Sequence, residues 1–202
     1  MLKLLLSVLA SLLLCTGCPQ DITAAADWSS MYGRPVPRMT KQGVRFKPIG
    51  VFHSPYTPAT GAPRQGVLRP QSRAEIEIYA PYRAALKDVD KFEYIWVLFY
   101  FDQVKGWRPE VRPPKSGHVF GLFATRSPKR PNPIALSLVK VESIDKGRIE
   151  ISGVDAFEGT PVLDLKPYLP SVDVVDSPKN RQTEKDLGHH NQVFLRDRSM
   201  FN

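Results

Sequence analysis

Proline occurs nineteen times among the 202 residues, roughly twice its average share in proteins. The proline ring fixes φ and removes a backbone donor, so neither a helix nor a central strand runs through it easily. The prolines therefore disfavour long helices and favour turns, extended loops and edge strands. The length suits one well-cored domain with appendages rather than two full domains. We expect one compact, mainly β domain at residues 46–170.

Short stretches with strand-like patterns lie between turns along this domain. Residues 74–79 alternate polar and apolar side chains, with Ile76 and Ile78 on one face of a half-buried strand. Residues 94–101 form a continuous apolar and aromatic run, which predicts a central strand buried on both faces. Further strands are expected at 45–52, 119–124, 134–141, 148–151 and 162–165.

One short helix is predicted at 81–89, because Pro81 suits a first helical position and several apolar residues after it share one face. Short strands at this spacing, with one weak helix, favour a barrel or a closed sheet. The domain is flanked by polar extensions: a linker at 19–45, predicted to be flexible, and a C-terminal tail at 171–202.

The first eighteen residues have the pattern of a secretory signal. A lysine at position 3 precedes an apolar run at 4–14, which is too short to span a bilayer. The segment Cys15-Thr16-Gly17-Cys18 then resembles a lipoprotein box, and this predicts lipidation at Cys18 and a membrane anchor. Translation from Met31 or Met39 would instead leave a cytoplasmic protein. Both compartments stay open at this point.

Charge is unevenly distributed along the chain. Seven cations and one acid, Glu110, lie between residues 105 and 130, giving this stretch a net charge of +6. A solvated basic face and a polyanion-binding face both fit this charge. The seven cations are Lys105, Arg108, Arg112, Lys115, Arg126, Lys129 and Arg130.

Metal-binding patterns are absent from the sequence of the domain. Both cysteines precede it, so it can form neither an internal disulfide nor a thiolate metal site. The four histidines, His53 among them, lack metal-ligand spacing and are interpreted as ordinary surface or turn residues. We therefore predict no metal site.

Several loops concentrate groups suited to ligand capture. In the segment 124–134, three prolines in six residues fix the backbone, while Arg126, Lys129, Arg130 and Asn132 offer hydrogen-bond donors for a phosphate or a carboxylate. A second loop places Arg64 and Gln65 between Pro63 and a glycine, and a third, at 155–161, carries two carboxylates and a hydroxyl.

Taken together, these segments resemble the TsaA-like (TrmO-type) family of S-adenosylmethionine-dependent tRNA methyltransferases. The resemblance covers about three-fifths of the chain and depends on separated motifs that keep the family's order and approximate spacing. The motifs are Ile49 to Tyr56, Pro63-Arg64-Gln65, Trp107-Arg108-Pro109, Val111 to Pro114, Thr125 to Ile134, Asp155 with Gly159-Thr160-Pro161, and Asp164 to Pro170.

The resemblance implies a small, eight-stranded closed β-barrel that works as a homodimer. It implies an enzyme that uses S-adenosylmethionine to methylate N6 of threonylcarbamoyladenosine beside the tRNA anticodon. The cofactor-binding residues implied by position are Pro63, Arg64, Gln65, Asp102, Gln103, Arg126, Leu136, Asp155, Glu158, Gly159 and Thr160. Contacts with RNA or the modified base are expected from Arg130, Asn132, Lys166 and Tyr168.

Methyl transfer from a sulfonium needs in-line placement of the acceptor, so proximity and orientation in a dry site supply most of the rate. The acceptor nitrogen must lose a proton, and Asp155, or a water that it holds, is the candidate base. Two alternatives remain: a methyltransferase with another small acceptor, and an exported lipoprotein whose barrel binds a small ligand or envelope component without catalysis.

Overall fold

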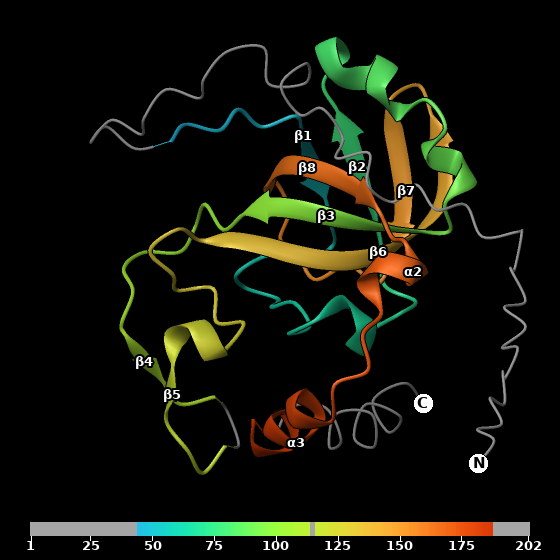
Figure 1. Cartoon of the computed structure of the whole chain (residues 1–202). Coiled ribbons are helices and arrows are strands. Elements are labelled where there is room, and N and C mark those ends of the chain that lie inside the picture. The colour runs from blue at the N-terminus through green and yellow to red at the C-terminus, as the bar shows by residue number, and fades with distance from the viewer. Residues whose placement is uncertain (1–43, 114–115, 188–202) are drawn as a thin grey trace, which may run out of the picture. The chain divides into compact units, whose positions relative to one another are not determined.

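Figure 1 shows the computed structural model of the chain, which describes residues 44–113 and 116–187. Its strands and helices belong to one compact unit, Phe46–Asn202. Six antiparallel strands close into a barrel in the order β1-β2-β7-β6-β3-β8, with β8 pairing back onto β1. The strands are β1 (Gly50–His53), β2 (Arg73–Ile78), β3 (Tyr94–Tyr100), β6 (Ile134–Asp145), β7 (Arg148–Ser152) and β8 (Pro161–Pro167).

The expected barrel of eight strands is wrong in its count. The remaining two strands, β4 (Glu110–Val111) and β5 (Phe120–Gly121), pair with each other in a separate two-stranded sheet. Prolines at 109 and 113 border β4, and a proline cannot donate the hydrogen bond that a barrel strand needs. The strand predicted at 119–124 ends after two residues in a 3-10 turn, η4 (Leu122–Ala124).

Alternating side chains of the six strands fill the barrel. Ile76 and Ile78 lie on one buried face of β2, as predicted. Phe52 of β1 and Phe99 of β3 meet edge to face, with ring centroids 5.3 Å apart. The hydrophobic core therefore lies inside the barrel, and the loops at its ends are free to carry function.

The interpretation of 94–101 as a strand buried on both faces is wrong. Burial along β3 alternates: Ile95, Val97 and Phe99 point into the core, whereas Tyr94 and Tyr100 are exposed. A continuous apolar run suits a strand covered on both sides, but a barrel wall has only one covered face. The outer face of β3 is therefore only partly covered, since Trp96 and Leu98 are half-buried between the exposed Tyr94 and Tyr100.

The helix predicted at 81–89 is replaced by two 3-10 helices, η2 (Ala80–Leu86) and η3 (Val89–Lys91). Asp88 lies between them with a φ of 67°, a left-handed conformation that interrupts the predicted helix. A third 3-10 helix, η1 (Gly66–Leu68), lies against β6. The chain after the barrel contains α2 (Pro170–Asp173) and α3 (Pro178–Asp186), neither of which has a buried residue.

The predicted signal segment, its lipidation residue Cys18 and most of the 19–45 linker lie outside the described residues. Among the helices that the structure describes, none is both long and apolar enough to cross a membrane. The described residues also contain no group of three histidine, cysteine or acidic side chains that could hold a metal ion.

Candidate functional site

Asp155 is the best-anchored polar side chain of the predicted site. It lies in the turn between β7 and β8, three residues after the end of β7. Its Oδ1 accepts a hydrogen bond of 2.6 Å from the Ser137 hydroxyl, and its Oδ2 accepts one of 3.2 Å from the backbone N–H of Gly66. Strand β6 and the start of η1 thus hold both oxygens of one carboxyl group.

The surroundings of Asp155 alter its acidity. Burial raises the pKa of this carboxyl from 3.8 to about 6, although hydrogen bonds from Ser137 and Gly66 and the charge of Arg126 act in the opposite direction. The group is therefore mostly ionised at neutral pH, and it can take up a proton without strongly acidic conditions. This property suits a proton acceptor.

A close approach of two backbone segments makes the Asp155 contact geometrically feasible. A Cβ atom on Gly66 would lie 1.7 Å from the carbonyl oxygen of Gly153, far inside any permitted contact. Only glycine therefore fits at position 66. Because Gly66 can pack directly against the chain that leads to Asp155, its N–H reaches the carboxyl group.

Arg126 and Gln65 meet beside this carboxyl group. The Arg126 Nη1 donates a 2.8 Å hydrogen bond to the Gln65 Oε1, although the two residues are 61 positions apart. Gln65 directly precedes Gly66, and the charge of Arg126 acts on Asp155. Three of the predicted residues, from three separate loops, therefore form one group, which we call the Gln65–Arg126–Asp155 cluster.

The other residues predicted to bind a cofactor are placed less centrally. Pro63 and Arg64 precede the cluster in the same loop. Asp102 and Gln103 are exposed in the turn that follows β3. Leu136 is 47% exposed and lies on the outer face of β6, opposite the inward-facing Ser137.

Glu158, Gly159 and Thr160 fasten the turn to β1 and to the residues that follow it. The Glu158 carboxylate accepts hydrogen bonds from the Ser54 N–H and from His53, and the Gly159 N–H donates to the carbonyl of Phe52. Thr160 is buried, and its carbonyl accepts from the Phe52 N–H. These three residues shape the turn that carries Asp155, and their described contacts are to β1, its extension and Phe157.

The four residues predicted to contact RNA fall into two regions. Arg130 donates to the carbonyls of Thr125 and Ser127 and lies 5.5 Å from the ring centroid of Phe123, while Asn132 is exposed just before β6. Lys166 pairs with Asp164 at 2.9 Å on β8. Tyr168 packs edge to face against Tyr94 and Trp96.

The basic stretch forms a segment beside the barrel, built around the β4-β5 pair (Figure 1). We call its described residues, 105–113 and 116–130, the basic arm; Lys115 lies outside the described residues. Lys105, Arg108 and Lys129 are exposed, as are the aromatic rings of Trp107 and Phe123. Cations interleaved with exposed aromatic rings suit the phosphates and bases of a nucleic acid.

Three residues that hold the Asp155 turn in place were not predicted to be functional. Ser137 interrupts the apolar inward series of β6 between Ala135 and Val139, and this polar position could have indicated a buried partner. Gly66 carries no sequence signal beyond being a glycine. His53, interpreted as an ordinary histidine, lies between two carboxylates that are distant in sequence.

The chain is thus a closed, six-stranded β-barrel with a cluster of polar loop residues and an appended basic arm. Residues 51–174 match the family model of the tRNA-methyltransferase O N-terminal domain, and the chain belongs to this family. The chain is 42% identical over 136 residues to the tRNA (adenine(37)-N6)-methyltransferase of Escherichia coli K12, covering 62% of this chain and 58% of that protein.

Two further relatives show how far the similarity extends. An S-adenosyl-L-methionine-binding protein of Archaeoglobus fulgidus is 37% identical over 136 residues, covering 67% of this chain and 97% of that one. The crystal structure of TrmO from Pseudomonas aeruginosa superposes with a TM-score of 0.57 at 35% identity, covering 68% of this chain and 62% of that one. This chain thus spans about three-fifths of the E. coli relative and nearly all of the archaeal one.

Proposed function

We propose that this protein transfers a methyl group from S-adenosylmethionine to tRNA. The observation that carries the proposal is the Gln65–Arg126–Asp155 cluster, in which a hydrogen-bonded guanidinium and amide lie beside a buried carboxyl group that is mostly ionised at neutral pH. Membership of the tRNA-methyltransferase O N-terminal domain family supports the same reaction. The E. coli relative is named a tRNA methyltransferase and the archaeal relative an S-adenosyl-L-methionine-binding protein.

The chemistry of the cluster fits this cofactor. Arg126 offers donors for the carboxylate of its methionine end, and Gln65 accepts from the guanidinium and helps to orient it. Charge-assisted hydrogen bonds from arginine are among the strongest available. Bound S-adenosylmethionine would supply an electrophilic methyl group on a sulfonium sulfur. The residues of the chain would bind it, orient the acceptor and remove a proton, so no covalent intermediate with the protein is needed.

Asp155 is the proposed proton acceptor. Its ionised carboxylate would remove the proton from the acceptor nitrogen, directly or through one water. Ser137 and the Gly66 N–H hold the two carboxyl oxygens in place, so the base is positioned before the acceptor arrives. We propose N6 of threonylcarbamoyladenosine, next to the anticodon, as that acceptor, with Arg130, Asn132, Lys166 and Tyr168 contacting the RNA or the modified base.

Replacing Arg126 tests the cofactor site. Arg126→Ala should weaken S-adenosylmethionine binding by roughly 10- to 100-fold, because it removes a charged hydrogen-bond partner. Calorimetric titration of the two proteins measures this loss. Lys91→Ala, which removes a cation paired with Asp88 outside the cluster, should leave the affinity unchanged. Unchanged affinity in Arg126→Ala would remove this residue from the site, and no heat in the wild-type protein at high ligand concentration would contradict the proposed function.

Salt dependence tests the basic arm. The affinity for tRNA should fall steeply as salt rises, because arm cations that neutralise phosphates release bound counterions. Replacing Lys105 and Arg108 together with alanine should reduce the slope of log affinity against log salt by about one for each lost phosphate contact. Filter binding or fluorescence anisotropy measures the slope. A flat salt response would mean that the arm is only a solvated face.

We also propose that the protein works as a homodimer. The exposed apolar side chains Tyr100, Ile134 and Leu136, on the paired strands β3 and β6, support a contact between two copies. Light scattering of the purified chain would test this, and a monomer at micromolar concentration would contradict it.

The compartment is a proposal as well. We propose a form of the protein that begins at Met31 or Met39 and stays in the cytoplasm, because both the cofactor and tRNA are found there. The lipoprotein box at 15–18 favours a second candidate, a lipid-anchored barrel that binds an envelope ligand without catalysis. Intact mass of the protein from fractionated native cells separates the two, since only the second would carry lipid on Cys18.

A further inference from the structure

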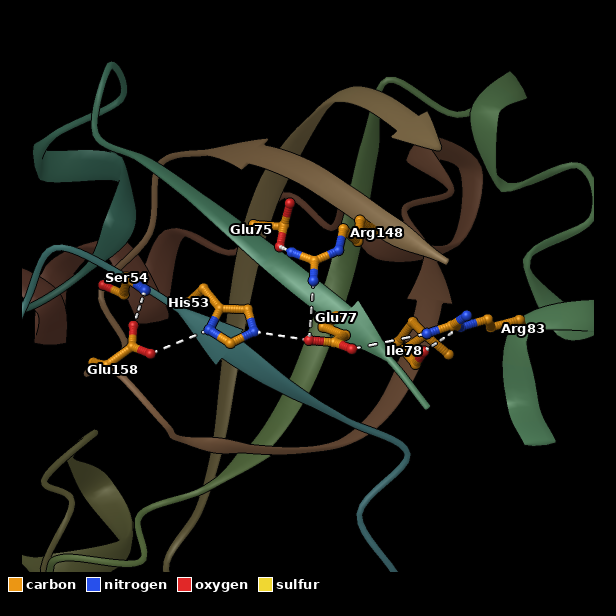
Figure 2. A network of polar contacts seen from close by, with 8 residues as sticks. All are labelled: His53, Ser54, Glu75, Glu77, Ile78, Arg83, Arg148 and Glu158. Atoms are coloured by element: carbon orange, nitrogen blue, oxygen red, sulfur yellow. Dashed lines mark hydrogen bonds and ion pairs between the residues drawn. The ribbon is translucent and has the colours of Figure 1, made fainter. Parts of the chain in front are cut away.

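His53, the last residue of β1, bridges two carboxylates from different parts of the fold (Figure 2). Its Nε2 lies 3.0 Å from the Glu77 Oε2 on β2, and its Nδ1 lies 3.1 Å from the Glu158 Oε1 in the turn before β8. We call this arrangement the Glu77–His53–Glu158 bridge. The side chains are partly exposed, 41% for His53, so solvent can exchange protons with the bridge.

The bridge requires a protonated imidazole. An ionised carboxylate only accepts hydrogen bonds, and a neutral imidazole has one N–H donor. With carboxylates at both ring nitrogens, only the imidazolium can donate to both. A neutral ring would place a nitrogen lone pair against one of the carboxylates, so loss of the proton would release one side of the bridge.

The charged groups around His53 favour the imidazolium. Glu75 and Glu77 face it from β2, and Glu158 faces it from the turn. Two arginines, Arg148 of β7 and Arg83 of η2, contact the acids of β2 and hold their carboxylates in place (Figure 2). Hydrogen bonds to Glu77 and then to Glu158 raise the pKa of His53 above 6.5.

The bridge acts on the turn that holds the proposed base. Glu158 follows Asp155 by three residues, and its carboxylate also accepts a 2.6 Å hydrogen bond from the Ser54 N–H. Between them, the carbonyl of Ala156 accepts from the Ser54 hydroxyl at 2.8 Å. The end of β1 therefore holds one half of the turn, while Ser137 and Gly66 hold Asp155 in the other half.

We propose that His53 is a pH-dependent positioning residue: as an imidazolium it fixes the Asp155–Thr160 turn to β1 and β2, and its deprotonation loosens the cofactor site. The inference rests on the proposed function, because it assigns a role in a cofactor site at this turn. It also predicts an effect on stability that requires no cofactor. Since the folded-state pKa of His53 is raised, the stabilisation is complete below pH 6.5 and is lost as the pH rises through the folded-state pKa.

The test compares the wild-type chain with His53→Gln, which keeps the size and a donor but cannot titrate. His118→Gln is the matched control for cofactor affinity and stability only, because His118 belongs to the basic arm, which we assign to tRNA, and packs on Phe120 rather than in the bridge. Dissociation constants for S-adenosylmethionine are measured by calorimetry from pH 6 to pH 9. The ratio of variant to wild type is compared across this range, so titration of the ligand itself cancels. Unfolding temperatures are measured over the same range without ligand.

For His53→Gln the ratio of the dissociation constants, variant to wild type, should be about two to five at pH 6, because a partly exposed ion pair is lost. This ratio should approach one at pH 9. The difference in unfolding temperature should shrink over the same range, and His118→Gln should show neither trend. A ratio and a temperature difference that stay constant with pH would overturn the inference. If the wild-type chain binds no cofactor at any pH, the proposed function fails, while the unfolding temperatures still decide whether the bridge is protonated.

Discussion

Asp155→Asn should lower the rate of methyl transfer to tRNA by about 10²- to 10⁴-fold, the usual contribution of a general base. The amide can replace the carboxylate geometrically, because its oxygen can accept from the Gly66 N–H and its nitrogen can donate to the Ser137 hydroxyl. The variant should therefore keep its fold and lose only the proton acceptor. Single-turnover kinetics with saturating cofactor measure this loss.

The pH dependence of the wild-type rate tests the same assignment. The rate should rise as the pH passes through about 6, where Asp155 ionises, and level off above it. Asp145→Asn, at the exposed end of β6, should retain both the wild-type rate and this profile. A normal rate in Asp155→Asn would show that another group removes the proton.

The same substitution should stabilise the protein at neutral pH. The raised folded-state pKa means that stability is lost as the pH rises through about 6, because ionised Asp155 is costly to bury. Asparagine carries no charge and avoids this loss, which is at most about 3 kcal/mol for a pKa that rises from 3.8 to about 6. Thermal unfolding at pH 3.5 and pH 8 should show a large gain only at the higher pH, because the loss develops between pH 3.8 and about 6.

Gly66→Ala should destabilise the folded protein and distort the site around Asp155. The new Cβ would lie 1.7 Å from the Gly153 carbonyl oxygen. Because this oxygen and its carbonyl carbon belong to the backbone, the chain itself must move. We expect a loss of about 3 kcal/mol in the free energy of unfolding, the upper range for overpacking. Cofactor affinity should fall with it, because the Gly66 N–H no longer reaches Asp155. Chemical denaturation and calorimetry measure the two effects.

Gly121→Ala is the matched control for this substitution. Gly121 has a φ of −57°, and an added Cβ would meet no atom within 4 Å. Its stability and cofactor affinity should equal those of the wild type. If Gly66→Ala behaved in the same way, the close approach of Gly66 and Gly153 would not be required for the fold or for the site.

Patterns within single strands could be predicted from the sequence, because they depend on local alternation. The face shared by Ile76 and Ile78 is such a case. The count of eight barrel strands, which the family resemblance implied, failed because β4 and β5 pair with each other outside the barrel and prolines border β4. Whether β3 has one or two covered faces depends on closure of the sheet, which no local pattern encodes.

Prediction of the site from the sequence was limited in the same way, because contacts between distant segments have no local pattern. Gln65, Arg126 and Asp155 could be selected because each lies in a loop with a distinctive composition, and the structure brings them together. The contacts of His53 could not be selected, because Glu77 and Glu158 are 24 and 105 residues away in the chain. Gly66 depends on the approach of a second backbone segment, which only the folded chain reveals.

The most direct test of the proposed function is methyl transfer itself. Unmodified and threonylcarbamoyl-modified tRNA are incubated with the purified chain and S-adenosylmethionine carrying a labelled methyl group, and the digested nucleosides are analysed by mass spectrometry. The proposal predicts label on threonylcarbamoyladenosine beside the anticodon, formed by the wild-type chain and nearly absent with Asp155→Asn. Cofactor binding without label in any tRNA nucleoside would contradict it.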